Sequence, residues 1–277
     1  MIPQTRCFQI GAVPIGGSSP LFLVAGPCVI ENETMPLRIA RALKEIAARV
    51  GVGFVFKASF DKANRMALGS YRGPGLQAGL EILAGVRRDA GVPVLTDVHD
   101  CAQVGPAAAV VDVLQIPAFL SRQTDLVVEA ARTMKPLNIK KGEFLAPWDM
   151  QHVAEKALST GNTKVFLTER GTTFGYGNLV NDMRAIPIMQ AFGLPVLFDA
   201  GHSVQQPGGR GGQSGGMREM IPTLACAAAG AGCDGIFVEV HEDPEHALSD
   251  GPNQLRVEEV EPLLRRLVAI HAAVRRE

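Results

Sequence analysis

Eight short apolar segments recur along the chain, and longer stretches with helical periodicity separate them. The segments are almost continuously apolar, which is typical of parallel strands covered on both faces. Eight strand–helix units within about 250 residues predict a (β/α)8 TIM barrel, an α/β fold. The predicted strands are Leu21–Ala25, Gly53–Ala58, Pro93–Asp97, Val111–Ile116, Leu137–Lys140, Lys164–Glu169, Pro195–Asp199 and Gly235–Glu239.

Amphipathic segments between the strands predict the helices of the barrel. A doubly wound open sheet is the alternative, but it would normally have fewer strands and a switch point in the strand order. The clearest predicted helices are Pro36–Val50, Leu76–Ala90, Asn178–Phe192, Met217–Ala231 and a last one carrying Leu263, Leu264, Leu267, Ile270 and Val274.

The first residues have a different pattern. Phe8 and Ile10, followed by Val13 and Ile15, alternate around Gly11-Ala12, which predicts a small β-hairpin. This hairpin, within residues 1–18, could cap the floor of the barrel. Because no linker or low-complexity tract divides the chain, we interpret residues 1–277 as a single barrel domain with an N-terminal hairpin extension.

The charge balance excludes some functions. Lys and Arg number 27 and Asp and Glu 28, giving a net charge of −1, whereas proteins dedicated to nucleic acids or membrane surfaces need a basic excess. No apolar run resembles a secretory signal or reaches the roughly 20 residues of a membrane span. Five widely spaced cysteines suggest no disulfide framework. We therefore expect a cytoplasmic protein without nucleic-acid or membrane partners.

A polar or charged residue follows each predicted strand, at the barrel edge where active sites lie in this fold. Burying a charge there costs several kcal/mol unless the charge is paired, so this pattern favours a functional site over chance. In chain order these positions are Gly26-Pro27-Cys28, Lys57, Asp97, Gln115, Lys140, Glu169-Arg170, His202 and Glu239.

Cys28, His202 and Glu239, together with Asp250, form a set of metal-binding residue types. A thiolate, an imidazole and two carboxylates suit a divalent transition metal such as zinc, iron or manganese. Taken one at a time, such residues more often serve packing, and a cysteine after a strand is usually a small buried side chain. The VHEDPEH segment is not a zincin motif, because its spacing differs and Pro244 would break the required helix.

A second set of candidate residues is basic. A solvated charged face explains most lysines, but Lys57 and Lys140 directly end apolar strands. In a nearly neutral protein such a cluster predicts an anionic substrate that carries phosphate or carboxylate groups. The basic candidates are Lys57, Lys62, Arg65, Arg72, Arg122, Lys140 and Arg170.

The segment at residues 208–216, GGRGGQSGG, is rich in glycine but lacks the spacing of nucleotide-binding loops. We expect a mobile loop over the barrel mouth that becomes ordered when substrate binds. A merely flexible connection is the equally weighted alternative.

Nine motifs, taken together, resemble the 3-deoxy-D-manno-octulosonate 8-phosphate synthases and span the chain from the first strand to the last helix. The KASFDKANR block is the most specific, because the related 3-deoxy-D-arabino-heptulosonate 7-phosphate synthases carry a different block there. The motifs are AGPCVIE (25–31), FKASFDKANR (56–65), YRGPG (71–75), TDVH (96–99), QIPAFLSRQTDL (115–126), NIKKGEFLAPWDM (138–150), TERGTTFGYGNLV (168–180), FDAGHSVQ (198–205) and EVHEDPEHALSDGP (239–252).

The resemblance implies a transferase that condenses phosphoenolpyruvate with D-arabinose 5-phosphate and releases phosphate, in lipopolysaccharide core sugar biosynthesis. It also implies a homotetramer. The family has a metal-dependent branch with cysteine in the first-strand motif and a metal-independent branch with asparagine there, so Cys28 is similar to the metal-dependent branch.

The resemblance also implies roles for single residues. The metal ligands would be Cys28, His202, Glu239 and Asp250; the phosphoenolpyruvate pocket would contain Lys57, Lys62, Gln115, Lys140 and Arg170; the sugar-phosphate side would contain Asn64, Arg65, Ser214 and, from a neighbouring subunit, Arg122. Asp97 is a further candidate for substrate binding. Lys62, His202, Asp250 and Cys28 are the catalytic candidates, with Lys62 the best candidate for proton transfer or alkoxide stabilisation.

Two positions depart from the family pattern. Met66 stands where many members have a small hydroxyl residue, and Gly201 replaces a more common threonine. Three alternative functions stay open: a heptulosonate phosphate synthase using erythrose 4-phosphate, a non-catalytic sugar-phosphate-binding barrel, and a metal-dependent hydrolase. The hydrolase would usually show an H-x-H pair on an early strand, which this sequence lacks.

Overall fold

The computed structural model describes residues 2–65, 67–210 and 213–275. Eight parallel strands form a closed barrel, because β14 pairs with both the first strand, β3, and the seventh, β11. Closure excludes the open sheet and confirms the predicted TIM barrel. In order around the barrel, the strands are β3 (Phe22–Gly26), β4 (Gly53–Lys57), β5 (Val94–Asp97), β6 (Val113–Ile116), β7 (Leu137–Lys140), β8 (Val165–Glu169), β11 (Val196–Asp199) and β14 (Gly235–His241).

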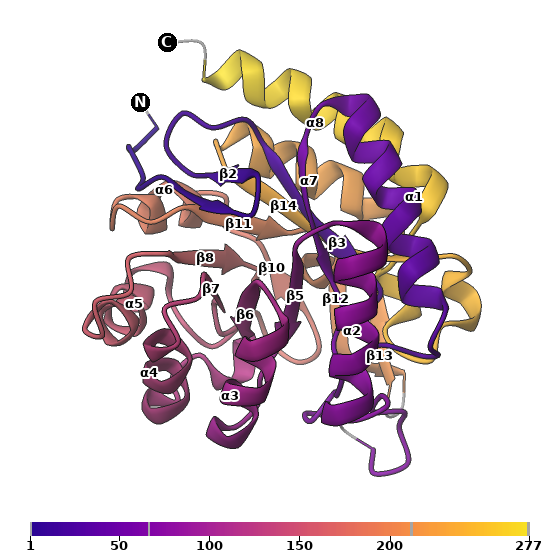
Figure 1. Ribbon diagram of the computed structural model, residues 1–277. Helices are drawn as coiled ribbons and strands as arrows, with labels where there is room; N and C mark the ends of the chain where they lie inside the picture. Colours follow the sequence, from indigo (N-terminus) through magenta and orange to yellow (C-terminus); the bar gives the residue numbers. More distant parts are fainter. Residues whose placement is uncertain (1, 66, 211–212, 276–277) are drawn as a thin grey trace.

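The described residues form eight α-helices. Figure 1 shows them around the outside of the strands. Their apolar faces pack on the outside of the barrel in one continuous core, with Ile39, Leu43, Leu83 and Leu264 almost fully buried. The helices are α1 (Met35–Val50), α2 (Leu76–Ala90), α3 (Cys101–Val110), α4 (Thr124–Arg132), α5 (Met150–Leu158), α6 (Ala185–Gln190), α7 (Ile221–Gly230) and α8 (Val257–Val274).

Two predicted helices are shorter than the periodicity suggested. Within the range 178–192, residues Leu179–Val180 form strand β10, which pairs with β9 (Thr172–Thr173), so only α6 is an α-helix. Leu179 is buried by this short hairpin rather than by a helix face. In the range 217–231 a 3₁₀ turn precedes α7, which begins at Ile221, where Pro222 is tolerated in the first turn.

The predicted N-terminal hairpin is confirmed as β1 (Phe8–Ile10) paired with β2 (Val13–Ile15). It closes the floor of the barrel: Ile10 and Ile15 share one buried cluster with inward-facing strand residues such as Phe166. Glycines keep the approach close, because a Cβ at Gly53, the first residue of β4, would lie 2.5 Å from Cγ1 of Val13. The opposite end of the barrel is left for the functional residues.

The glycine-rich segment forms part of a β-hairpin, a pairing that its composition did not indicate. Strand β12 (Gln205–Arg210) pairs antiparallel with β13 (Gln213–Gly216). Gly216 lies so close to the side chain of Asn253 that a Cβ at this position would overlap it. The absence of a side chain therefore lets the hairpin pack on the segment before α8, which explains glycine at this position.

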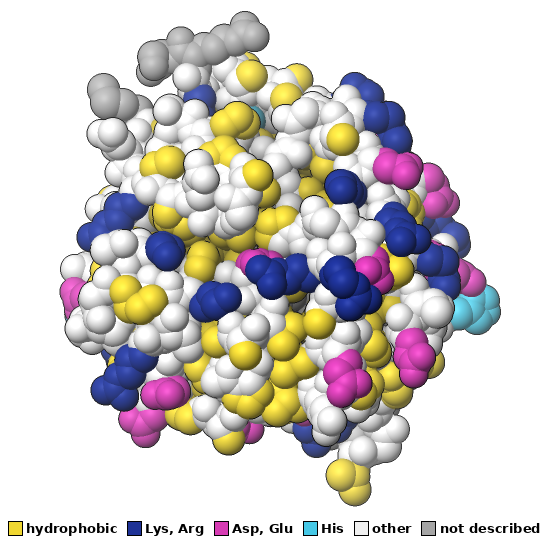
Figure 2. Space-filling view, in the orientation of Figure 1, with side chains coloured by type: hydrophobic (Ala, Val, Ile, Leu, Met, Phe, Trp, Pro, Cys, Tyr) yellow, Lys and Arg dark blue, Asp and Glu magenta, His cyan; other side chains and the backbone are white. Residues whose placement is uncertain are grey.

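Within the described residues, no helix combines the length and apolar character needed to cross a membrane. On the face drawn in Figure 2, basic and acidic side chains are interspersed rather than gathered into one basic field. This distribution agrees with the net charge of −1.

Candidate active site

A cavity of about 470 Å³ opens at the carboxyl ends of the barrel strands. Lys57 and Lys140, the last residues of β4 and β7, line it together with Lys62, Arg65 and Arg170 from the following loops. This arrangement confirms that the basic residues converge in a hollow rather than form a solvated face. Arg72 and Arg122 are the exceptions: Arg72 pairs with Asp61 at the surface, Arg122 is exposed, and neither lines the cavity.

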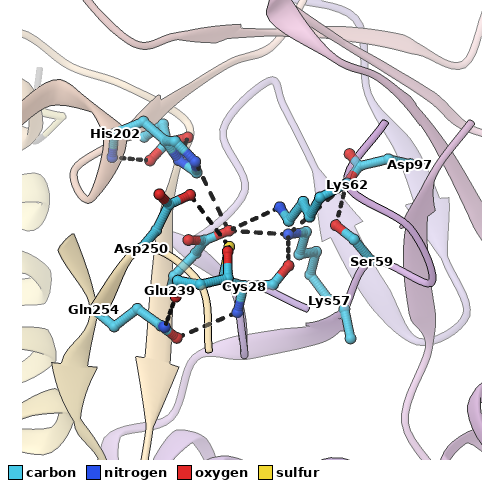
Figure 3. Close-up of polar contacts among 12 residues, drawn as sticks. Cys28, Lys57, Ser59, Lys62, Asp97, His202, Glu239, Asp250 and Gln254 are labelled. Atoms are coloured by element: carbon cyan, nitrogen blue, oxygen red, sulfur yellow. Dashed lines mark hydrogen bonds and ion pairs between the residues drawn. The ribbon is translucent and has the colours of Figure 1, made fainter. Parts of the chain in front are cut away.

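One thiol and two carboxylate side chains meet beside this cavity. Cys28 follows β3, Glu239 lies in β14 and Asp250 lies in the loop after it, and one donor atom from each falls within 4.8 Å of the other two. Sγ of Cys28 is 3.4 Å from Oδ2 of Asp250. Figure 3 shows these side chains pointing toward one another from opposite ends of the sequence. The group is the only one of three or more metal-type residues found within the described residues.

The donor set fits a divalent metal. Oε2 of Glu239 is buried and has no hydrogen-bond partner among the described residues, so this oxygen is free to act as a ligand. Burial, together with the charge of Glu239, raises the pKa of the Cys28 thiol. A bound cation would oppose this effect, because metal coordination favours the thiolate. Thiolate and carboxylates are ligands of zinc, iron and manganese.

His202 lies next to this group but not fully within it. Its Nε2 is 3.8 Å from Oε1 of Glu239, yet the imidazole is not part of the cluster of mutually close donors. On its other side, Nδ1 lies 2.8 Å from Oδ2 of Asp199. The four ligands expected from the sequence are therefore seen as three grouped donors with the imidazole adjacent to them.

Two neighbouring side chains hold Cys28 in place. Gln254 accepts a hydrogen bond from the backbone N–H of Cys28 at 3.2 Å, and Ser249 lies 2.8 Å from its sulfur. Gln254 itself donates to the carbonyl oxygen of Ser249 at 2.8 Å. The segment that carries Asp250 is thereby fixed against the end of β3.

Lysines neutralise the buried acid of this group. Lys57 donates to Oε1 of Glu239 at 3.0 Å and to the backbone carbonyl of Cys28 at 3.1 Å. Lys62 lies 3.8 Å from the same carboxylate oxygen. Burial alone would raise the pKa of Glu239, but Lys57 and His202 hold it well below its usual range. The carboxylate therefore stays ionised and available to a cation.

Lys62 retains its proton in this setting. Burial alone would lower the pKa of its ammonium group, but the surrounding acidic groups, Cys28 and Glu239 foremost, raise it above the ordinary lysine value. A charged lysine at a cavity wall can stabilise a developing oxyanion or donate a proton to it.

Asp97 and Gln115 form a buried pair on the neighbouring strands β5 and β6. The amide of Gln115 donates to one carboxylate oxygen of Asp97, and the hydroxyl of Ser59 donates to the other. Lys57 is 3.9 Å from the same carboxylate. Asp97 lines the cavity, whereas Gln115 is 1% exposed and stands behind it. In this arrangement Gln115 orients Asp97.

Lys140 and His202 share one partner. Nζ of Lys140 donates to Oδ2 of Asp199 at 2.6 Å, and the ammonium group lies 4.0 Å from the ring centroid of Phe237. Burial alone would raise the pKa of Asp199, but His202 and Lys140 hold it far below its usual range. Asp199 is thus an ionised acceptor that orients a basic residue of the cavity and the imidazole beside the metal-type group.

Arg170 is held at the cavity wall by Glu143 and Gln205. Its guanidinium donates to Oε2 of Glu143 at 2.7 Å and to Oε1 of Gln205 at 3.0 Å. Both partners line the same cavity. Arg170 is 3% exposed, so its charge is directed into the cavity and not toward bulk solvent.

The sugar-side candidates are less completely defined. Asn64 and Arg65 line the cavity, and Arg65 contacts Ser249 and lies 3.6 Å from Asp250. Arg122 is exposed and lies outside this cavity. Met66 and the side chain of Ser214 lie outside the described residues.

Gly201 has a steric explanation. A Cβ at this position would lie 2.8 Å from the carbonyl oxygen of Asn253, which is closer than side chains normally approach. A threonine at this position would therefore require the Asn253 backbone to move, and glycine permits the close approach seen here.

Sequence reasoning missed several residues of the site, namely Ser59, Glu143, Asp199, Ser249 and Gln254. Asp199 had a recognisable signal, because it is the last residue of an apolar strand, as Lys57 and Lys140 are. The sequence analysis named His202, three residues later, as the polar residue that follows this strand. Ser249 and Gln254 had no local signal, since their partner Cys28 is 221 and 226 residues away in the sequence.

Fold and site together define a barrel enzyme with a cavity lined by basic residues beside a group able to hold a metal. Comparison with known proteins identifies the family of this enzyme. The model of the DAHP synthetase I family matches residues 4–275. The chain belongs to this family.

Similar curated proteins share one name, 2-dehydro-3-deoxyphosphooctonate aldolase. The protein from Geobacter sulfurreducens is 58% identical over 272 residues, which are 98% of this chain and 100% of that one. The protein from Geotalea uraniireducens is 59% identical over 267 residues, covering 96% and 98% of the two chains. The protein from Syntrophobacter fumaroxidans is 58% identical over 259 residues, covering 94% and 90%.

Proposed function

We propose that this chain is a 3-deoxy-D-manno-octulosonate 8-phosphate synthase. It would condense phosphoenolpyruvate with D-arabinose 5-phosphate and water, release inorganic phosphate, and supply an acidic sugar for the lipopolysaccharide core. The observation that carries this proposal is similarity over the full length to proteins named 2-dehydro-3-deoxyphosphooctonate aldolase. The basic cavity supports it, because both substrates are phosphorylated and one is also a carboxylate.

In this reaction the methylene carbon of phosphoenolpyruvate attacks the aldehyde carbon of the sugar phosphate, and a carbon–carbon bond forms. The aldehyde oxygen becomes an alkoxide and takes a proton. Water adds to the cationic carbon that bore the phosphate, and the bond from that carbon to the phosphate oxygen then breaks. The carbonyl group left on the product keeps the oxygen of water; the first water proton replaces the one given to the alkoxide, and the second leaves with phosphate.

The cavity residues divide between the two substrates. Lys140 and Arg170 would bind the carboxylate and phosphate of phosphoenolpyruvate, while Asn64 and Arg65 would bind the sugar phosphate. Lys57 and Asp97, which are paired at the cavity wall, complete the enolpyruvate side. Holding two mutually repelling anions in a reactive orientation can supply roughly 7–11 kcal/mol of the barrier.

Lys62 is the proposed partner of the new alkoxide. It lines the cavity and keeps its proton, because its pKa lies above the ordinary lysine value. A charged ammonium group stabilises the oxyanion as it develops and then donates the proton that converts it to a hydroxyl group.

We place this chain in the metal-dependent branch. Cys28, Glu239 and Asp250 would hold the ion, and the adjacent His202 would complete the set. When bound, a divalent ion such as zinc, iron or manganese supplies Lewis-acid polarisation of an oxygen atom. Asp199 keeps the imidazole oriented toward Glu239, and Lys57 keeps that carboxylate in position.

We further propose a cytoplasmic homotetramer with one domain per chain. Two features support shared sites: Arg122 is exposed outside the cavity of its own chain, and Phe119 lines the cavity mouth while 50% exposed. The five cysteines are free, which suits a reducing compartment.

One specific observation favours a second candidate, because the family model carries the description DAHP synthetase I. The chain would then use erythrose 4-phosphate as the aldehyde. The deciding experiment measures phosphate released from phosphoenolpyruvate with arabinose 5-phosphate, with erythrose 4-phosphate and with no aldose. We expect release only with arabinose 5-phosphate. Preference for erythrose 4-phosphate would support the alternative, and no aldose-dependent release would support a non-catalytic barrel.

A further inference from the structure

Lys141 follows the cavity residue Lys140 but points away from the cavity into a fully buried site. Its side chain is 0% exposed and does not line the cavity. Nζ of Lys141 donates hydrogen bonds to three oxygen atoms: Gly171 O at 3.0 Å, Thr172 Oγ1 at 3.0 Å and Leu145 O at 3.3 Å. It also forms an ion pair with Oε1 of Glu169 at 3.4 Å.

Glu169, the last residue of β8, folds back over the turn that follows it. Its Oε1 accepts the backbone N–H of Arg170 at 3.1 Å and that of Gly171 at 2.7 Å. Gly171 has a φ of +94°, a conformation suited to glycine, so the chain turns sharply directly after Arg170. The carboxylate thus fixes the backbone from which the Arg170 side chain projects.

Lys141 joins this turn to a second segment. Through Leu145 it holds the loop between β7 and α5, and through Gly171 and Thr172 it holds the turn after β8. Glu143 of the first segment binds the guanidinium of Arg170 at 2.7 Å. The backbone of Glu143 also accepts from Thr173 N at 2.8 Å. The two side chains that meet at the cavity wall are therefore carried by segments tied together behind it.

We propose that Lys141 and Glu169 are positioning residues that fix the guanidinium of Arg170 for the phosphoenolpyruvate side of the cavity. The inference rests on the proposed function for its substrate. A buried ion pair is a costly way to fill space, since apolar residues of similar volume often stabilise a fold at least as well. A pair kept in this place, directly behind a substrate-facing arginine, is explained by the geometry that it imposes.

The test compares the two substrates in steady-state kinetics. Lys141→Met and Glu169→Gln should each raise the KM for phosphoenolpyruvate by about tenfold, as expected when a supporting residue is removed, and leave the KM for arabinose 5-phosphate within about twofold. A purely structural role would change both constants or neither. An equal rise in both KM values, or no rise for phosphoenolpyruvate, would overturn the proposal.

A double-variant cycle identifies the residue through which Lys141 acts. In an Arg170→Lys background, the additional effect of Lys141→Met on the KM for phosphoenolpyruvate should fall below about twofold, because residues in one network are not additive. A full additional tenfold effect would show that Lys141 does not act through Arg170.

Thr172→Val covers the case in which Lys141→Met fails to fold. It removes one hydrogen bond to Lys141 and keeps the side-chain shape, so the KM for phosphoenolpyruvate should rise about two- to fivefold. Thr160→Val is the matched control, since its hydroxyl donates to the carbonyl oxygen of Ala157 in α5 and accepts from the backbone N–H of Asn162, without contact to Lys141. No difference between these two threonine variants would overturn the inference.

Binding of phosphoenolpyruvate by titration calorimetry separates this inference from the proposed function. A wild-type protein that binds phosphoenolpyruvate without aldose-dependent turnover would refute the synthase but still allow the comparison of variants by Kd. A wild-type protein that does not bind phosphoenolpyruvate would overturn both.

Discussion

His202 and Asp199 are joined by a 2.8 Å contact between Nδ1 and Oδ2, three residues apart at the end of β11. Because an ionised carboxylate can only accept, Nδ1 carries the proton and Nε2 is left to face Glu239. The same carboxylate oxygen binds Lys140. One buried acid therefore orients groups from two parts of the site.

Asp199→Asn should reduce kcat by about 10- to 100-fold, because the amide keeps the size of the side chain but not the charge that orients His202 and Lys140. Steady-state phosphate release is the measurement. Asp182→Asn is the matched control, since Asp182 pairs with Arg184 at the surface. Equal activity of the two variants would show that the contact with His202 has no catalytic role.

Lys57→Met should lower the free energy of unfolding of the metal-free protein by about 3–5 kcal/mol, because Glu239 would remain as a buried charge without its closest cation. Urea denaturation in the presence of chelator measures the change. Lys44→Met, which removes a hydrogen bond to the backbone of Ala90, is the control and should cost far less. A comparable cost for both would contradict the electrostatic account.

Gln254→Ala should weaken metal binding by about 10- to 100-fold, because Gln254 holds the backbone of Cys28 and the segment carrying Asp250. Competition with a metal indicator dye measures the affinity without reference to turnover. Gln151→Ala, a change on the exposed face of α5, should bind the metal as wild type does. Unaltered affinity in Gln254→Ala would mean that Cys28 needs no support from this amide.

Stability should fall between pH 6.5 and pH 4 in part through His271. Burial and the neighbouring Arg275 lower the pKa of this histidine to about 4 in the folded protein. The unfolded chain, with an ordinary pKa of about 6.5, therefore binds more protons in this window, and acid favours unfolding. Urea unfolding at pH 7 and at pH 5 measures the loss.

His271→Gln should lose less stability between these two pH values than the wild type, whereas the exposed His152→Gln control should match it. An identical pH dependence in His271→Gln would show that the buried imidazole does not contribute.

The barrel was predictable because its strands are buried on both faces, which leaves apolar runs that end within one or two residues of their true bounds, as at Leu137–Lys140. The helix predicted at residues 178–192 was too long because Leu179 is buried in a hairpin. Apolar periodicity cannot distinguish burial in a hairpin from burial on a helix face. The glycine-rich hairpin was missed because its packing against Asn253 is not a local property of the sequence.

The charged residues that end strands were predictable as a group, and Lys57, Lys140 and Arg170 do meet in one cavity. Their partners were not, since Glu143 and Asp199 act through contacts with residues 27 and 59 positions away. Position on a strand indicates which edge a side chain reaches, whereas pairing depends on how the barrel closes.

We propose that Cys28, Glu239 and Asp250 hold a metal that turnover requires. The decisive measurement is arabinose 5-phosphate-dependent release of phosphate from phosphoenolpyruvate, before and after one equivalent of zinc, iron or manganese is added to protein freed of metal. We expect no release from the metal-free protein and restored release with a divalent ion. Undiminished release from protein verified to contain no metal would contradict the claim.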